Sequence, residues 1–532
     1  MTKKTNGAGE DPILLEVYKS LLTAAAEEMG AALQQSAFSP NIKERRDFSC
    51  ALFNADGRMT AQAAHIPVHL GAMPLSVQAC MDAHTFEPGD AVILNDPYEG
   101  GTHLPDITLV TPVFLPGETR PFAFAASRAH HADVGGMSPG SMPLSREIYQ
   151  EGLIIPPIKI MERGKRNASL WKLLLANTRT PNEREGDLNA QFAANHIGAE
   201  RLKAIVKRRG KSETADCMDG LLRYSERMMR AFIADLPDGV YEYEDHMDDD
   251  GVDPEPVGIA VSIAVKGGEA AVDFSGSSTQ RAGNVNAVEA IAVSAAHYAF
   301  LSLLAPGMPM NAGSCAPITV HAPQGTVVNA RRPAAVAAGN VETSQRIVDA
   351  LLGALAKAAP TQTPAASQGA MNNLTVGGID PRTGRSYAYY ETIAGGAGAG
   401  YNNPGVNAVH THMTNTLNTP VEALEYAYPF RVSEYSMRVG SGGEGQYRGG
   451  NGVVREIELL ADASATLLAE SRKRAPYGIN GGQPGTPGED YLIREGKKTR
   501  IPGKTQLELQ KGDRLRIETP GGGGYGPKAE NG

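Results

Sequence analysis

Two short apolar runs, residues 91–94 and 107–110, flank a loop rich in glycine, proline, carboxylate and imidazole side chains. Runs of this length, bounded by turn-forming residues, are typical of buried strands. The loop has the sequence NDPYEGGTHLPD (residues 95–106), and a second polar segment, SRAHHADVGG, occupies residues 127–136. Because glycine lets the backbone turn tightly, short side chains of both segments can converge on one point. The chain is therefore expected to place a polar site between buried strands.

The composition predicts a large folded core and excludes several classes of partner. Of 532 residues, 41% are hydrophobic and 20% are charged, so wholesale disorder is not expected. The length fits roughly two to four domains. The net charge is −9 and no basic stripe alternates with aromatic residues, so a nucleic-acid partner is not expected. No apolar run approaches ~18 residues, which predicts that the chain does not span a membrane.

Cysteine usage and the start of the chain predict the compartment. The four cysteines form no C-x-x-C pair, which argues against a disulfide scaffold and fits a reducing environment. The first ten residues are polar and lack the apolar core of a secretory signal. We therefore expect a cytoplasmic protein.

The polar loop contains a candidate metal site. His103 and Asp106 are three residues apart, and Pro105 disfavours a helical conformation at Leu104, so we expect the pair to meet in a tight loop. With His130 they supply two imidazoles and one carboxylate, which suit a divalent cation such as zinc or manganese. Such a set leaves coordination positions open for water or substrate. The alternative is a buried, hydrogen-bonded His–Asp pair without a metal.

Two further residues near this set have open roles. Asp47 is a candidate fourth ligand, and the alternative is an ion pair with Arg45 or Arg46. His131 follows His130 directly. If both lie on a strand, their side chains point to opposite faces, so only one of them would bind the metal.

The remaining candidates concern proton transfer and orientation. Asp133 could accept an imidazole N–H and so orient a ligand. His65 and His69 lie in an apolar loop, where a histidine is either structural or a general base near neutral pH. His410 and His412 alternate as strand residues would, so both could face one pocket.

We predict a mixed α+β fold, in which a metal-bearing N-terminal α/β part precedes a β-rich, glycine-rich C-terminal part. Helical spacing of apolar residues appears in residues 12–35 and 185–234, and a turn signal follows at residues 236–239. A further helix is expected from about residue 342 to 358, capped by Thr343 or Ser344. The predicted units are a flexible tail (1–11), an N-terminal mixed α/β metal-site domain (12–235), a central β/α domain (236–375) and a glycine-rich, β-dominated C-terminal domain (376–532).

Across most of its length the chain resembles the hydantoinase B/oxoprolinase family. The resemblance rests on many segments in the family's order. They are ERRDFSC (44–50), HIPVHLG (65–71), residues 95–106, EGLIIPP (151–157), GDLNAQ (186–191), HMTNT (412–416) and GGGYG (522–526).

The resemblance implies a metal site and a partner. Members of the family include B subunits of ATP-dependent hydantoinases, 5-oxoprolinases and caprolactamase-like enzymes, together with subunits of acetone and acetophenone carboxylases. In these systems an A-type ATPase subunit uses ATP and magnesium to phosphorylate the substrate, and the two subunits would form an α2β2 assembly. By resemblance, His103, Asp106 and His130 match metal ligands, and Asp47 matches a further acidic position.

The expected function follows from this resemblance. We expect the metal-dependent hydrolytic B subunit of an amidohydrolase for a small cyclic amide such as a hydantoin, lactam or 5-oxoproline. His69 or His131 would move protons, and Asp133 would orient an imidazole. The alternative is a subunit of an ATP-dependent ketone carboxylase. The GTHLPD sequence of residues 101–106 differs from the acetone carboxylase branch and is closer to the amidohydrolase branch. The chain has no G-x-x-x-x-G-K-[ST] motif, so ATP is expected to bind the partner.

Overall fold

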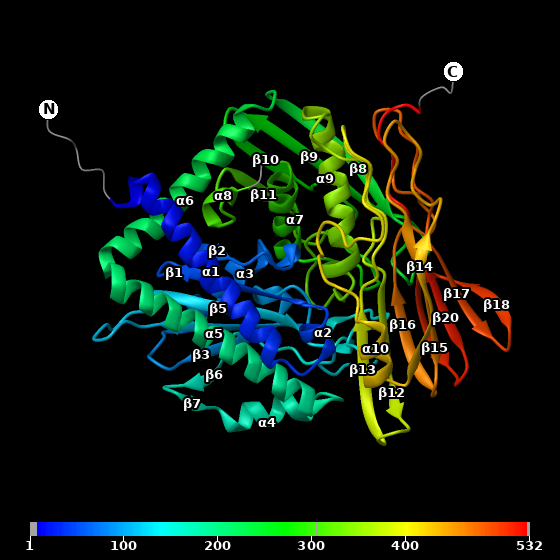
Figure 1. Cartoon of the computed structure of the whole chain (residues 1–532), viewed down its shortest axis with the longest axis horizontal. Coiled ribbons are helices and arrows are strands. Elements are labelled where there is room, and N and C mark those ends of the chain that lie inside the picture. Colours follow the sequence, from blue (N-terminus) through cyan, green and yellow to red (C-terminus); the bar gives the residue numbers. More distant parts are fainter. Residues whose placement is uncertain (1–7, 305–306, 529–532) are drawn as a thin grey trace.

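The computed structural model describes residues 8–304 and 307–528, and it confirms the predicted mixed α+β fold. Helices and sheets alternate along the first two thirds of the chain, and the last third consists mainly of strands. Figure 1 shows the N-terminal helices α1 and α6 at one end of the molecule and strands β14 to β20 at the other. Within the described ranges, no helix combines the length and the apolarity needed to cross a membrane.

The first sheet contains seven strands in the order β2-β1-β5-β4-β3-β6-β7, and all neighbouring strands are antiparallel. The two strands predicted from apolar runs are confirmed as β3 and β4. The strands are β1 (Phe48–Asn54), β2 (Met59–Gln62), β3 (Ala91–Leu94), β4 (Asp106–Val113), β5 (Ala123–His130), β6 (Ile158–Glu162) and β7 (Lys165–Arg166).

Helices cover both faces of this sheet. Helices α1 (Pro12–Ser36) and α5 (Pro181–Arg209) pack against each other and over one face, whereas α3 (Ala72–Ala83) packs on the other. Successive residues of β1 serve opposite faces, as the pleat of a strand requires. Leu52 belongs to the core beneath α1, and Phe53 belongs to the core beneath α3. The sheet is therefore buried on both sides.

The predicted helix at residues 12–35 is confirmed as α1. The Asp11 side chain accepts hydrogen bonds from the first backbone N–H groups, and Pro12 occupies the first turn, where its missing N–H costs nothing. The predicted flexible tail lies partly outside the described residues, which begin at residue 8. Ala8–Glu10 form a 3₁₀ turn (η1), and Gly9 packs directly on the backbone of α6, so residues 8–11 are structured, contrary to the prediction. Only glycine permits this close contact.

The predicted helical region at residues 185–234 contains two helices, α5 and α6 (Lys211–Ala234). They meet at Gly210, whose φ of 95° favours glycine. Two short helices, α2 (Pro40–Lys43) and α4 (Ala168–Ala176), complete the N-terminal part.

The central part is a four-stranded sheet, order β11-β10-β9-β8, with α9 packed on β8 and β9. A π-helical turn, η5 (Gly339–Thr343), precedes α9. Neither Thr343 nor Ser344 caps the helix as predicted, because their hydroxyls bond to the carbonyl oxygens of Val285 and Asn340. The elements are β8 (Gly239–Met247), β9 (Val257–Lys266), β10 (Glu269–Asp273), β11 (Ile318–His321), α7 (Glu289–Ser302), α8 (Ala312–Cys315) and α9 (Ser344–Ala358).

Two sheets form the C-terminal part, in the orders β13-β12-β16-β19 and β14-β15-β20-β17-β18. They share one apolar core, to which Leu374, Ile457 and Ile517 contribute. The elements are β12 (Asn373–Asp380), β13 (Arg385–Glu391), α10 (Val421–Ala427), β14 (Phe430–Arg438), β15 (Gly452–Leu459), β16 (Ala463–Leu468), β17 (Glu489–Arg494), β18 (Lys497–Ile501), β19 (Lys504–Leu509) and β20 (Arg514–Glu518).

One predicted domain boundary needs correction. The boundary after residue 375 falls inside β12, where no turn interrupts the strand. The largest apolar core also runs from Ile66 through Val257 to Leu468, so it joins residues from all three predicted units. The boundary near residue 236, in contrast, falls in the turn between α6 and β8.

A buried strand residue and an exposed one give a test of this packing. Phe53 is completely buried under α3, whereas Ile379 on β12 is 62% exposed. We expect Phe53→Ala to lower the free energy of unfolding by about 3–5 kcal/mol, because it leaves a cavity in a dense core. Ile379→Ala should cost less than about 1 kcal/mol. Urea unfolding followed by circular dichroism compares the two variants, and equal losses would contradict the assigned packing.

Candidate metal centre

Asp106 and His130 are paired across two neighbouring strands. Asp106 is the first residue of β4, His130 is the last residue of β5, and the ladder places them directly opposite each other. His103 lies in the turn that leads into β4, and the Asp106 N–H donates to the His103 carbonyl oxygen at 3.1 Å. The loop conformation predicted from Pro105 is therefore confirmed. One ligand atom from each of the three side chains lies within 4.8 Å of the other two.

The Asp106 carboxylate is the centre of this cluster. Its Oδ1 lies 3.1 Å from Nε2 of His103 and 3.3 Å from Nδ1 of His130. Its Oδ2 accepts a hydrogen bond from the Thr102 hydroxyl at 2.8 Å. His103 Nδ1 lies 3.2 Å from the Ala337 carbonyl oxygen, so Nε2 is the ring nitrogen that faces Asp106. This ring orientation suits a metal ligand.

The site is fully buried, and its charges are strongly coupled. Burial alone would raise the pKa of Asp106, but the charge of His103 and hydrogen bonds from the surrounding imidazoles hold that pKa well below its usual value. Burial lowers the pKa of His130. For His103, burial acts in the same direction, but Asp106 outweighs it and raises the pKa. The arrangement keeps the carboxylate ionised and His130 neutral, which are the forms that bind a cation.

These residues fit a divalent cation. The donor set contains imidazole nitrogen and carboxylate oxygen in one buried cluster. The Nε2 atom of His130 is also buried and finds no hydrogen-bond partner among the described residues. Buried polar atoms are normally satisfied, so an unpaired nitrogen at such a cluster indicates a missing partner.

Asp47 lies beside the cluster, immediately before β1. Its carbonyl oxygen accepts the His130 N–H at 3.0 Å, and its carboxylate lies 3.9 Å from Nη1 of Arg45. Burial raises the pKa of Asp47, while the nearby His130 and Arg45 oppose that increase. Both roles considered for Asp47 thus remain compatible with its position.

His69 joins the cluster from the 3₁₀ turn η2 (Pro67–His69). Its Nε2 lies 3.3 Å from Oδ2 of Asp106, and its Nδ1 lies 2.7 Å from the Ser49 hydroxyl. Burial lowers the pKa of His69, which favours the neutral form of its ring. The candidate general base therefore lies in direct contact with the candidate metal ligands.

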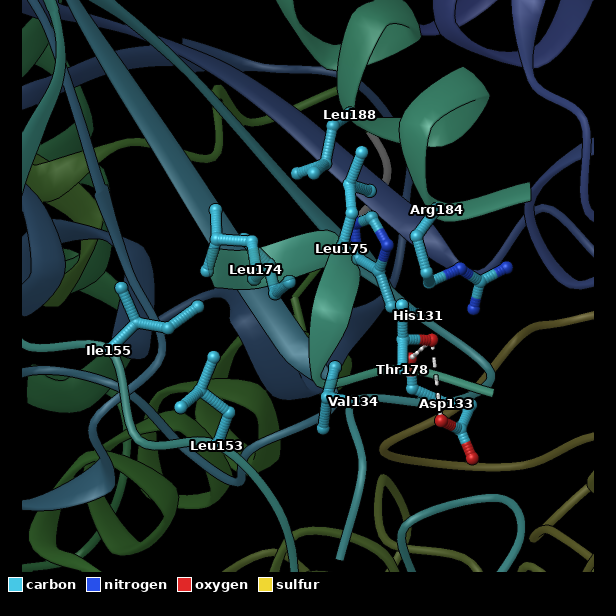
Figure 2. Close-up of a pocket in the computed structure, with 11 residues that line it drawn as sticks. His131, Asp133, Val134, Leu153, Ile155, Leu174, Leu175, Thr178, Arg184 and Leu188 are labelled. Carbon is cyan, nitrogen blue, oxygen red and sulfur yellow. Dashed lines mark hydrogen bonds between the residues drawn. The ribbon is translucent and has the colours of Figure 1, made fainter. Parts of the chain in front are cut away.

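His131 does not contact the cluster. Its Nε2 bonds to the amide oxygen of Gln191 at 2.9 Å, and burial lowers its pKa to about 4. Figure 2 shows His131 beside Arg184 at the edge of a cavity lined largely by leucine, isoleucine and valine side chains. The cavity measures about 20 Å³, which is room for about one water molecule. β5 ends at His130, so His131 lies just beyond the strand, and among the described residues His131 makes no hydrogen bond to the cluster.

Asp133 has a structural environment. Its carboxylate accepts hydrogen bonds from the Thr178 hydroxyl at 3.3 Å and from the Arg179 guanidinium at 2.9 Å, and the contact with Thr178 is drawn in Figure 2. It also accepts backbone N–H groups of Gly135 and Arg179. These partners occupy both of its oxygens, so the structure does not support the expectation that Asp133 orients an imidazole.

The other histidines considered from the sequence lie outside the cluster. His65 Nδ1 accepts the Cys50 N–H at 3.1 Å, and burial lowers the pKa of His65 to about 4, which fits a structural role. His410 and His412 do not lie on a strand, because φ at His412 is 55°. His412 Nε2 lies 3.7 Å from Oδ1 of Asp349.

Several residues that the sequence did not single out complete the site. Tyr390 on β13 stacks on the His130 ring, with 4.3 Å between centroids and 15° between planes. Glu151 accepts the backbone N–H groups of Val336 and Ala337 and so holds the carbonyl that receives His103. Glu151 belongs to a segment that carried the family resemblance, but no local pattern indicated Tyr390.

Asn340, in the π-helical turn η5, also reaches the cluster. Its side-chain nitrogen lies 3.0 Å from Nε2 of His103 and 3.3 Å from Oδ2 of Asp106. The sequence itself indicated no role for this residue.

The amino-acid sequence matches the hydantoinase B/oxoprolinase family model over residues 11–528. The chain therefore belongs to this family, as its resemblance predicted. It is 43% identical to an uncharacterized protein of Methanocaldococcus jannaschii, over 98% of this chain and 91% of the relative. It is 34% identical to a protein of Pseudomonas sp. that is named as the B subunit of a D-/L-hydantoinase, over 98% of this chain and 90% of the relative.

Other relatives are longer. The chain is 38% identical to 5-oxoprolinase 1 of Arabidopsis thaliana, over 97% of this chain but only 42% of the relative. Among solved structures, the ATP-dependent caprolactamase from Pseudomonas jessenii has a TM-score of 0.90 and 30% identity, covering 97% of this chain and 91% of that chain. Acetone carboxylase has a TM-score of 0.88, with 97% and 76% covered; its 19% identity shows a shared fold alone.

The divergence of two adjacent histidines gives a matched test of the metal site. We expect His130→Ala to reduce bound zinc or manganese to well below one ion per chain, because it removes one of three ligands. His131→Ala should leave metal content near that of the wild type, since its side chain bonds to Gln191 rather than to the cluster. Elemental analysis of both purified variants measures the content. Equal loss in both variants would contradict the assignment.

Proposed function

We propose that this chain is the metal-dependent hydrolytic component of an ATP-dependent hydrolase for a small cyclic amide. The supporting observation is the convergence of His103, Asp106 and His130 in a buried site. The names of the relatives support the substrate class, because they include 5-oxoprolinases and an ATP-dependent caprolactamase.

An unstrained amide reacts slowly with water because resonance stabilises its C–N bond. Transfer of a phosphoryl group from ATP to the amide oxygen gives an imidate-like carbon, which water attacks more readily. The products are ADP, phosphate and the ring-opened acid, which is an amino acid from a lactam and an N-carbamoyl amino acid from a hydantoin. A divalent cation, zinc or manganese, held by His103, Asp106 and His130 with Asp47 as a further ligand, would act as a Lewis acid and lower the pKa of a water molecule.

The remaining steps belong to residues of this chain. We assign the proton of the attacking water to His69, because this histidine lies directly against Asp106. The Ser49 hydroxyl fixes the His69 ring through its contact with Nδ1. Burial of the whole cluster excludes competing water, which strengthens each electrostatic contact.

We further propose an A-type ATPase subunit as the partner, in an α2β2 assembly that uses ATP and magnesium. One relative is named as the B subunit of a hydantoinase. This chain also covers only two fifths of the 5-oxoprolinases that it matches, so a complete reaction of that type needs protein that lies outside this chain. The ketone carboxylase remains the alternative, and only the fold relates it to this chain.

The proposed division of labour predicts the behaviour of the separated components. The isolated chain should hydrolyse neither ATP nor a cyclic amide. With its ATPase partner it should release phosphate in the presence of one member of a panel containing hydantoin, 5-oxoproline and caprolactam. Removal of the metal by a chelator should abolish ring opening. Full ATP-driven turnover by the isolated chain would overturn the proposed partner.

The chemistry itself is tested with labelled bicarbonate. The hydrolase hypothesis predicts that no label enters the product, and that ring opening gives one new carboxylate, with a new amine from a lactam or a carbamoyl nitrogen from a hydantoin. Transfer of label into an acidic product of a ketone would overturn the hydrolase in favour of the carboxylase. The complex carrying His103→Ala is the control, because neither reaction should proceed without the cluster.

A further inference from the structure

We propose that Asn340 is an additional member of the metal site, in which its amide takes two orientations. Without a cation, the side-chain nitrogen lies against the ligand atoms of His103 and Asp106. When a cation binds, the amide turns and its oxygen becomes a ligand. This inference rests on the metal centre of the proposed function. It adds a residue from a segment far from the other ligands in the sequence.

The contacts of Asn340 place it at the metal-binding atoms themselves. Its Nδ2 lies 3.0 Å from Nε2 of His103 and 3.3 Å from Oδ2 of Asp106. Nδ1 of His103 faces the Ala337 carbonyl, so Nε2 is the ring nitrogen that faces both Asn340 and Asp106. The amide nitrogen therefore lies against the same ring nitrogen that a cation would use.

The other end of the same amide has no partner. Oδ1 of Asn340 is buried and accepts no hydrogen bond from the described residues. A buried amide oxygen without a donor carries an energetic cost, and such groups usually have an unseen partner. A half turn about the last side-chain bond exchanges the nitrogen and the oxygen with little change of shape.

Charge decides which orientation is favoured. Without a cation, turning the amide would place its oxygen beside Nε2 of His103 and against the Asp106 carboxylate, a second acceptor that repels it. With a cation between them, the same three atoms are all attractive ligands. An amide nitrogen has no lone pair available for a metal, so only the turned amide can coordinate.

The backbone that carries Asn340 is held in place. Gly339 packs on the carbonyl oxygen of Asn286, at a distance that no side chain would permit. On the other side, Glu342 accepts the N–H groups of Met371 and Asn372 at 2.9 and 3.1 Å. Single π-helical turns are frequent at functional sites, because they shift a side chain out of the regular helical path. Here the turn directs Asn340 toward His103.

A neutral oxygen ligand has a specific consequence. It adds a donor atom without adding negative charge, so the cation keeps more of its Lewis acidity than it would beside another carboxylate. We therefore expect the amide, rather than an acid, to suit a site that must activate a substrate oxygen or water.

The test uses Co²⁺ alone as the probe, with the full-length chain after metal removal. Competition with a chromophoric chelator gives the affinity, and the visible absorption of bound Co²⁺ reports its ligands. Asn340→Ala should weaken binding by about 10- to 100-fold, the usual loss for a residue that supports a metal site. Asn195→Ala is the matched control. Asn195 is also buried, and its side-chain oxygen has no partner among the described residues. Its side-chain nitrogen bonds to Leu109 and Thr111, away from the cluster. The Co²⁺ affinity of Asn195→Ala should therefore stay within twofold of the wild type.

Asn340→Asp separates ligation from structural support. Its carboxylate offers oxygen in every orientation, so it should bind Co²⁺ at least as tightly as the wild type and change the absorption spectrum. Without metal, this variant should unfold at a lower temperature than the wild type, since the new carboxylate lies against Asp106. Addition of Co²⁺ should raise the unfolding temperature again. This variant also decides the question if Asn340→Ala fails to fold.

The outcomes distinguish this inference from the proposed function. His103→Ala should lose Co²⁺ binding; if it binds as tightly as the wild type, the metal centre itself is wrong. If His103→Ala loses binding while Asn340→Ala matches Asn195→Ala, only the role of Asn340 is overturned. Weaker binding by Asn340→Asp than by the wild type would also overturn it.

Discussion

The buried charge of Asp106 is the constraint on which the rest of the site depends. An ionised carboxylate removed from water is costly unless hydrogen bonds or opposite charges surround it. Asp106 is almost completely buried. Its carboxylate oxygens lie within 3.3 Å of the Thr102 hydroxyl and of one ring nitrogen from each of three histidines. These groups come from the turn before β4, from β5 and from η2. The chain thus arranges three separate segments around one carboxylate, and the same arrangement provides a site for a cation.

The later parts of the chain close this site. Tyr390 of β13 stacks on His130, Arg45 lies 4.9 Å from the Tyr390 ring centre, and η5 brings Asn340 to His103. One continuous apolar core that reaches from Ile66 to Leu468 holds these segments together. The metal site and the fold therefore share the same long-range contacts.

Local signals made part of this structure predictable. Asp11 and Pro12 mark the start of α1, and Pro105 favours the loop before β4. Each of these depends on neighbouring residues only. Asn340 lies 237 residues from His103, and no pattern around it indicated a ligand.

Two other expectations show that a local sequence pattern does not identify distant contacts. Asp133 was placed near the histidines on sequence proximity, but Arg179 and Thr178 provide its partners through a fold contact. His410 and His412 alternate in the sequence, but the positive φ of His412 breaks the strand that the alternation implied. Period and spacing predict an element and its faces; they do not identify which distant segment packs there.

The charge balance of the site gives a physical reason to include Asp47. A divalent cation held by Asp106 and neutral imidazoles would leave a net positive charge in a buried cluster, which is costly. Asp47 is the nearby carboxylate whose own burial is poorly compensated, since burial raises its pKa. Its distance of 3.9 Å from Arg45 is longer than a direct hydrogen bond.

Arg45 itself has other partners. Its guanidinium donates to the side-chain oxygen of Asn41, to the Tyr390 carbonyl at 3.1 Å and to the Thr392 hydroxyl at 2.8 Å. The arginine is therefore satisfied without Asp47, and its charge serves to hold β13 over the site. Asp47 is left free to neutralise a cation, and the neutral amide of Asn340 can add an oxygen without disturbing that balance.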